Sequence, residues 1–260
     1  MRKLIALGIL LLSATAVAKP GDWKKLGKTG TWKNTMHAVG DGGALYTIEK
    51  DGTFYVTDLT TGQYRKIGNP DYQNTLGLLA EKGTVITLEK DGSLYRINPT
   101  DGSWKPLGKP GEWGGTIAGV LLDGALYTIE KNGALYITDV DTGVWKQIGK
   151  PEFAKTGLIT ATGGRIYTIE TSGTLYAVEK DGRWKAVGKP GDYKNTRHMM
   201  GLAGKVYTIE SSGKLYVTDP ATAKWVDLGD DYQTTAFFLA SGNKLYTLGG
   251  DGSLYVIEPM

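Results

Sequence analysis

The feature that most constrains the fold of this chain is a repeat that occurs six times. One tyrosine marks each copy, at Tyr55, Tyr95, Tyr136, Tyr176, Tyr216 and Tyr255. Successive copies are 40, 41, 40, 40 and 39 residues apart. A period of this length indicates a repeat architecture in which each copy is one supersecondary unit.

Each copy contains a predicted β-hairpin. A small residue and a glycine stand before the marker tyrosine, at Asp51-Gly52, Asp91-Gly92, Asn132-Gly133, Ser172-Gly173, Ser212-Gly213 and Asp251-Gly252. Asp-Gly and Asn-Gly between alternating apolar runs are typical of a two-residue type I′ turn. In the first hairpin such a turn pairs Ile48 with Tyr55 and Tyr46 with Thr57. Both faces are then largely apolar, so we expect the sheet to be covered on both sides.

Two further strands complete each copy. An aromatic strand follows the hairpin, marked by Tyr64, Trp104, Trp145, Trp184 and Trp225, and an apolar strand such as 75–80 or 156–162 precedes it. Four short strands in about 40 residues are typical of a β-propeller blade. The predicted fold class is therefore all-β, a six-bladed β-propeller with four-stranded antiparallel blades.

The two ends of the chain complement each other. The last hairpin reaches Met260 without an aromatic strand after it, and "DWKKLGK" at 22–28 is an aromatic strand without a hairpin before it. We expect this N-terminal strand to complete the blade of the C-terminal hairpin. Ring closure of this kind removes exposed strand edges.

These motifs resemble three propeller families. Glycine, leucine-tyrosine, then glycine and tryptophan is similar to the repeat of tectonin and tachylectin-type lectin propellers, which implies sugar sites repeated in each blade. "DGTFYVTDLTTG" at 51–62 resembles the repeat of quinoprotein-type propellers, a group that includes periplasmic outer-membrane assembly scaffolds, although the gap from Gly143 to Trp145 is shorter here. "YVTD" at 55–58 is similar to YWTD propellers without their middle tryptophan. All three likenesses imply the fold, and fold alone does not determine function.

The start of the chain predicts export. Arg2 and Lys3 precede the apolar run 4–12, and Ala16 to Ala18 has the small residues of a cleavage site. Residues 1–18 are therefore interpreted as a secretory signal peptide and 19–260 as one propeller domain, secreted or periplasmic and expected to be a monomer. No other stretch is long and apolar enough to predict a membrane span. The chain has no cysteine, so its stability must come from its core.

The composition disfavours several classes of function. Removing Arg2 and Lys3 from the formal net charge of +3 leaves +1, without the basic footprint of a nucleic-acid-binding protein. The two histidines, His37 and His198, are 161 residues apart, at the same place in two inner strands. We expect them to be polar inner-strand residues, and we expect no metal site and no cofactor.

A glutamate recurs before the hairpin turn, at Glu49, Glu89, Glu130, Glu170 and Glu210, with Gly249 in the last copy. Glycoside hydrolysis needs two carboxylates about 5 to 9 Å apart, whereas copies in different blades are a blade width apart. We therefore expect no catalysis and interpret these glutamates as solvated hairpin ends.

The connection between copies supplies the candidate site. It carries one aromatic residue in each copy, Trp32, Tyr72, Trp113, Phe153, Tyr193 and Tyr232. An acid precedes five of the six, at Asp71, Glu112, Glu152, Asp192 and Asp231. An exposed ring beside a carboxylate is one way of holding a sugar. The alternative is that each ring fills the seam between two blades, and the mixture of Trp, Tyr and Phe favours this structural role.

The function predicted from the sequence is a non-catalytic binding protein with a glycan or protein ligand. The first hypothesis is lectin-like glycan binding at rim sites repeated between blades, and the alternative is a protein-interaction scaffold of the cell envelope. Solvent exposure of the six connecting rings separates these two hypotheses, because burial of the rings removes the sugar platform that the first hypothesis needs.

Overall fold

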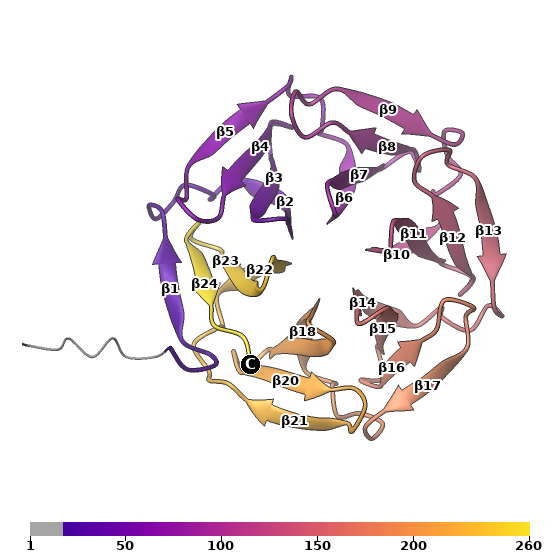
Figure 1. Cartoon of the computed structure of the whole chain (residues 1–260). Helices are drawn as coiled ribbons and strands as arrows, with labels where there is room; N and C mark the ends of the chain where they lie inside the picture. The colour runs from indigo at the N-terminus through magenta and orange to yellow at the C-terminus, as the bar shows by residue number, and fades with distance from the viewer. Residues whose placement is uncertain (1–17) are drawn as a thin grey trace, which may run out of the picture.

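The protein is a ring of six four-stranded antiparallel sheets, which confirms the predicted propeller (Figure 1). The structure is a computed structural model that describes residues 18–260, and these residues form 24 strands. The expected signal peptide falls almost entirely outside the described residues. In each blade the innermost strand lies at the centre of the ring and the aromatic strand at its circumference (Figure 1).

The first three blades follow one another in sequence. Blade 1 consists of β2 (Thr35–Asp41), β3 (Ala44–Glu49), β4 (Phe54–Asp58) and β5 (Tyr64–Ile67). Blade 2 consists of β6 (Thr75–Glu81), β7 (Thr84–Glu89), β8 (Leu94–Ile97) and β9 (Trp104–Leu107). Blade 3 consists of β10 (Thr116–Leu122), β11 (Ala125–Glu130), β12 (Leu135–Asp139) and β13 (Trp145–Ile148).

The other three blades complete the ring. Blade 4 consists of β14 (Thr156–Thr162), β15 (Arg165–Glu170), β16 (Leu175–Val178) and β17 (Trp184–Val187). Blade 5 consists of β18 (Thr196–Leu202), β19 (Lys205–Glu210), β20 (Leu215–Asp219) and β21 (Lys224–Asp227). Blade 6 consists of β22 (Thr235–Ser241), β23 (Lys244–Gly249), β24 (Leu254–Ile257) and, from the other end of the chain, β1 (Trp23–Leu26).

The N-terminal strand closes the ring as predicted. Strand β1 pairs antiparallel with β24, with Trp23 opposite Ile257 and Leu26 opposite Leu254. Figure 1 shows β1, in indigo, outside the yellow β24. The edge that β24 would otherwise expose is covered by the chain's own first strand.

The predicted register of the hairpins is wrong by one residue. Ile48 pairs with Phe54, and Thr47 pairs with Tyr55. The turn is a three-residue loop of Lys50, Asp51 and Gly52, in which Glu49 N–H donates to Thr53 O at 2.9 Å and Gly52 alone has a positive φ, of 80°. Asp51 favours this longer loop because its Oδ1 accepts a hydrogen bond from Thr53 N–H at 2.9 Å.

The one-residue difference in register exchanges the two faces of the sheet. A shift of one residue turns every side chain of a strand to the other side. In blade 1, Tyr55 therefore shares a face with Thr47 rather than with Ile48. The equivalent face of each blade carries the site described below.

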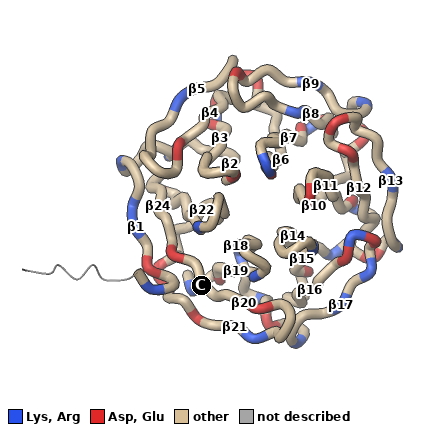
Figure 2. The backbone as a smooth tube through the Cα atoms, in the orientation of Figure 1, with Lys and Arg blue, Asp and Glu red and all other residues tan. Residues whose placement is uncertain are grey.

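The hydrophobic core lies in the seams between blades. One cluster joins Ile48 and Phe54 of blade 1 to Val85 and Ile97 of blade 2, and five similar clusters are described for the other seams. The prediction that both faces of a blade are covered is thus confirmed. Charged residues of both signs are interspersed around the ring (Figure 2).

Candidate functional site

The six connecting aromatics are buried in the seams. Their side chains are between 3% and 7% exposed. Trp113, for example, packs with Ile86 and Leu94 of blade 2 and with Leu126 of blade 3. Rings this buried do not present open faces for a sugar to stack on, and the structural role that the sequence favoured is the one the geometry supports.

Hydrogen bonds hold these rings in place. The hydroxyl of Tyr72 donates to Gly102 O at 2.8 Å, and that of Tyr232 donates to Gly21 O at 2.8 Å. The indole N–H of Trp32 donates to Thr57 Oγ1 at 3.3 Å. Burial raises the pKa of both Tyr72 and Tyr232 to about 12. The tyrosines therefore stay neutral under ordinary conditions, as buried hydroxyls do.

The acids before these rings are exposed, and three of them bind groups of the chain itself. Glu112 accepts a hydrogen bond from Lys109 N–H, and Asp192 accepts one from Lys189 N–H, both at 2.8 Å. Glu152 accepts one from Trp184 Nε1–H at 2.9 Å. These three carboxylates shape the connecting loops, whichever ligand the protein binds.

The exposed aromatic rings of the propeller belong to the outermost strands instead. Their side chains are between 43% and 58% exposed, at Trp23, Tyr64, Trp104, Trp145, Trp184 and Trp225. Each contacts the marker tyrosine of its blade edge-on, with ring centroids from 4.8 Å for Tyr95 and Trp104 to 5.9 Å for Tyr55 and Tyr64. In the sequence these residues marked strands, and no pattern singled them out as site residues.

Between the connecting ring and the exposed ring lies a pocket at the mouth of the seam. The pockets of blades 1, 2 and 3 have volumes of about 400, 480 and 310 Å³. Each is lined by the connecting ring, a threonine and a glutamate of the second strand, the marker tyrosine and the exposed ring. In blade 2 these residues are Tyr72, Thr87, Glu89, Tyr95 and Trp104.

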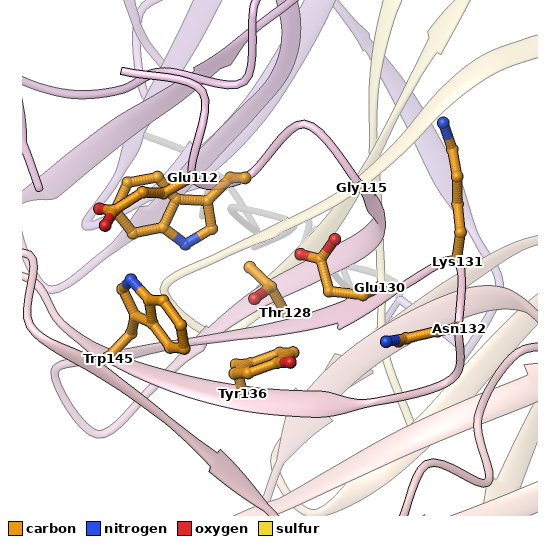
Figure 3. Close-up of a pocket in the computed structure, with 9 residues that line it drawn as sticks. Glu112, Gly115, Thr128, Glu130, Lys131, Asn132, Tyr136 and Trp145 are labelled. Carbon is orange, nitrogen blue, oxygen red and sulfur yellow. The ribbon is translucent and has the colours of Figure 1, made fainter. Parts of the chain in front are cut away.

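Figure 3 shows the same arrangement in blade 3. Thr128 and Glu130 of β11 lie between Tyr136 of β12 and the segment that carries Glu112 and Gly115, with Trp145 of β13 at the outer side. The corrected register produces this convergence, because Thr128 pairs with Tyr136 and Thr138 with Trp145 on one face of the sheet.

The glutamate of each of these pockets is held by a threonine at the start of the first strand. Thr35 Oγ1 donates to Glu49 Oε1 at 2.8 Å, and Thr75 Oγ1 donates to Glu89 Oε1 at 3.0 Å. In blade 3 the same bond, from Thr116 to Glu130, is 2.7 Å long. These glutamates are half-buried or buried, and Glu170 and Glu210 are half-buried as well, so the expectation that the five glutamates are solvated hairpin ends is wrong.

Burial affects the ionisation of two of these carboxyls. It raises the pKa of Glu49 and of Glu89. The hydroxyls of Thr35 and Thr47 oppose the rise for Glu49, and those of Thr87 and Thr75 oppose it for Glu89. The charged carboxylate is thus partly removed from water.

Blades 4 to 6 differ in the same region. A lysine follows the glutamate in blades 1 to 3, at Lys50, Lys90 and Lys131, whereas Thr171, Ser211 and Gly250 occupy this position in the other blades. Blade 6 has Gly249 in place of the glutamate. The pockets of blades 5 and 6 are smaller, about 130 and 90 Å³. The pockets of blades 1 to 3 are therefore similar to one another and larger than those of blades 5 and 6.

Of the residues predicted for the site, nine line described pockets. They are Trp32, Tyr72, Trp113, Tyr193, Tyr232, Asp71, Glu112, Asp192 and Asp231. Phe153 is buried, and Glu152 is bonded to Trp184. The structure thus brings the predicted residues to the edge of each pocket, while the marker tyrosines and outer tryptophans supply its accessible aromatic surface.

The two histidines connect neighbouring blades rather than meeting each other. His37 Nε2 lies 2.9 Å from Thr75 O, and His198 Nε2 lies 3.1 Å from Thr235 O. Burial lowers the pKa of both. Each ring occupies the inner-strand position predicted for it.

Residues 18–260 contain no group of three or more His, Asp or Glu side chains arranged to hold a metal ion. Within the same residues, no helix has the length and apolarity needed to cross a membrane.

Solved structures with a similar fold belong to several kinds of protein. Virginiamycin B lyase from Staphylococcus aureus has a TM-score of 0.60 and 13% identity, over 92% of this chain and 88% of the other. YCF48 bound to D1 peptide has a TM-score of 0.59 and 13% identity, over 92% and 97%. BamB from Moraxella catarrhalis has a TM-score of 0.50 and 15% identity, over 85% and 68%.

These likenesses establish the fold alone, because every identity is low and one fold serves many functions. The sequence matches no protein-family model and no curated protein.

Proposed function

We propose that this chain is an exported, non-catalytic binding protein that holds sugar units in the seam pockets of blades 1 to 3. The observation that carries the proposal is the threefold recurrence of one pocket with an exposed aromatic ring, a carboxylate and a buried hydroxyl. Trp104, Glu89 and Thr87 form this set in blade 2. Aromatic rings stack on the apolar face of a sugar, and a carboxylate accepts hydrogen bonds from its hydroxyls.

Repetition of the pocket favours binding over catalysis. Three equivalent sites in consecutive blades are suited to a ligand that is itself repetitive, for which several weak contacts add up to useful avidity. The resemblance to tectonin and tachylectin-type propellers supports this reading, since it implies sugar sites repeated in each blade. Export rests on the signal-like residues 1–18.

A protein or peptide ligand is the second candidate. One observation favours it: YCF48, whose fold this chain shares over 97% of that protein's length, was solved with a D1 peptide. Exposed tryptophans are also common at protein interfaces. A scaffold of the cell envelope would use the same rim of exposed rings.

The mature protein from Lys19 should be applied to a glycan array and to insoluble polysaccharides. We expect retention by at least one glycan, with loss of most binding in Trp104→Ala and in Trp145→Ala. Trp184→Ala is the matched control, because Trp184 is equally exposed but its indole N–H is bonded to Glu152. Absence of binding to every glycan, together with recovery of an envelope protein, would support the second candidate instead.

The same variants give the assay a check on folding. Trp104, Trp145 and Trp184 are all at the circumference of the ring (Figure 1). Each of these rings contacts the marker tyrosine of its blade, so each substitution should cost a similar amount, about 0.5–1.5 kcal/mol in the free energy of unfolding. Equal thermal unfolding temperatures would therefore show that lost binding is a local effect.

A further inference from the structure

We propose that the sugar units bound by blades 1 to 3 carry a positively charged amino group, and that each pocket is an aromatic and carboxylate cage for that ammonium. The inference rests on the proposed function and specifies the class of sugar. Its central residues are the glutamates of the three pockets, Glu49, Glu89 and Glu130.

The first feature that favours a cationic ligand is the ion pairing of these three carboxylates. Within residues 18–260, none of the three forms an ion pair with a Lys, Arg or His nitrogen within 4.0 Å. The neighbouring lysines act on these groups only from a distance. The charges of Lys50 and Lys90 lower the pKa of Glu49 and Glu89 without forming an ion pair, and Lys90 Nζ donates to Gln73 O at 3.3 Å. Figure 3 shows Lys131 extending away from Glu130. A partly buried charge is costly unless it is paired, so an incoming cation gains more here than at an exposed carboxylate.

A second feature that favours a cation is a buried threonine hydroxyl in the lining of each pocket. The Oγ1 atoms of Thr47, Thr87 and Thr128 are buried and make no hydrogen bond of normal geometry among the described residues. Those of Thr47 and Thr87 are still close enough to Glu49 and Glu89 to lower the pKa of these carboxyls. All three threonines line their pockets. A buried hydroxyl without a partner has lost its contact with water, and a ligand that bonds to it recovers this loss.

The third feature is the pair of aromatic rings opposite these groups. Tyr136 and Trp145 meet edge-on at 5.3 Å in blade 3, and the pairs in blades 1 and 2 are arranged in the same way. The faces of such rings are negative and attract ammonium groups within about 6 Å. An ammonium has three donors and no acceptor, so a carboxylate, a hydroxyl oxygen and a ring face satisfy it together.

The charge of the lining agrees with this assignment. In blade 2 the lining includes three acids, Asp71, Glu89 and Asp91, against the single base Lys90. Blades 1 and 3 each contribute two acids and one lysine. All three linings are therefore net negative. Burial also raises the pKa of Glu49 and Glu89, a rise that a bound cation would oppose.

Calorimetry with three tetrasaccharides of similar length tests the inference. The probes are a β-1,4 tetramer of glucosamine, its fully N-acetylated form and the corresponding tetramer of glucose, at about pH 6, where amines of the α-amino type are protonated. We expect the glucosamine tetramer to bind at least about tenfold more tightly than the two neutral tetramers. Added salt should weaken its binding selectively.

Two variants assign the preference to the pockets. The triple variant Glu49→Gln, Glu89→Gln, Glu130→Gln should lose the tenfold preference while keeping its thermal unfolding temperature, because glutamine oxygen can still accept the threonine hydroxyl. Asp230→Asn, at an exposed carboxylate that lines none of the three pockets, should keep the preference.

The possible failures are distinguishable. Equal affinity for the three tetramers, or retention only of neutral or acidic glycans on the array, overturns the amino-group assignment and leaves sugar binding standing. Persistence of the preference in the triple variant also overturns it. Binding of no glycan of any kind overturns both this inference and the proposed function.

Discussion

The backbone N–H of Trp113 donates a hydrogen bond of 3.0 Å to the carbonyl of Gly92, across the loop that joins blade 2 to blade 3. The same bond, between a connecting aromatic and the hairpin glycine of the preceding blade, recurs at all six seams. Connections and hairpin turns therefore lie on one side of the ring. The pockets open on this side because the bond brings the connecting ring beside the hairpin.

Truncation of a connecting ring should destabilise the whole propeller. Trp113 is 3% exposed and fills the seam, so Trp113→Ala removes a buried indole and leaves a cavity. We expect a loss of about 3–5 kcal/mol in the free energy of unfolding, measured by denaturant titration. Trp145→Ala is the control, since Trp145 is 43% exposed. Equal losses in the two variants would contradict the seam role of Trp113.

Two glycines with nearly the same φ should respond differently to substitution. Gly92 has a φ of 81°, and a Cβ there would lie 2.5 Å from Gly114 N. Gly124 has a φ of 77° and open space around its Cβ position. Gly124→Ala should lower the free energy of unfolding only by the cost of the left-handed conformation, about 1–2 kcal/mol. Gly92→Ala should lower it by more, because the connecting loop must also move. Thermal unfolding of both variants measures the difference.

Removal of the N-terminal strand should open the ring. A variant that begins at Lys28 lacks the four residue pairs between β1 and β24 and the bond from Tyr232 to Gly21. We expect a loss of at least about 2 kcal/mol, which corresponds to roughly 4–8 °C in Tm for a chain of this size. The exposed edge of β24 should also promote association, visible by light scattering. A monomeric variant with unchanged Tm would show that closure contributes little.

Neutralising a pocket glutamate should not destabilise the free protein. Burial raises the pKa of Glu89 in the folded state above its unfolded value, so the folded state binds the proton more tightly. The contribution of Glu89 to the free energy of unfolding is therefore complete at low pH. It decreases as the pH rises from about 4.3, the pKa of a glutamate in the unfolded state, through the higher pKa of the folded state.

Glu89→Gln removes this dependence, because glutamine does not titrate. At pH 7 the variant should have a Tm equal to the wild type or a few degrees above it, and the difference should shrink as the pH falls below about 5. Asp230→Asn, at an exposed carboxylate, is the control and should show no such trend. A lower Tm for Glu89→Gln at neutral pH would mean that the charged carboxylate stabilises the fold through contacts other than its threonine.

The fold was predictable to the extent that residues repeat along the chain. Gly52 and Tyr55, with their counterparts, reveal the blade, and Trp23 without a preceding hairpin reveals the closure. Local hydrogen bonding decided what the pattern could not: Asp51 caps Thr53 and lengthens the turn by one residue, which reverses the facing of Tyr55.

The candidate site was predictable only in part. The sequence placed it at the blade junctions and named Trp113 and Glu112 there, and both line the pocket of blade 3. It did not single out Tyr136 and Trp145, because whether a strand aromatic is buried depends on the register and on the neighbouring blade. A sequence signal for the three special blades did exist, in the lysines that follow Glu49, Glu89 and Glu130.

The sequence by itself determined the number of blades, the order of their strands and the closure of the ring, because a repeated pattern of turns and apolar residues reports on local structure that each copy forms alike. Only the tertiary structure decided which aromatic rings face solvent. That choice depends on contacts between residues of adjacent blades, and packing in the seam buries Trp113 while leaving Trp145 at the rim.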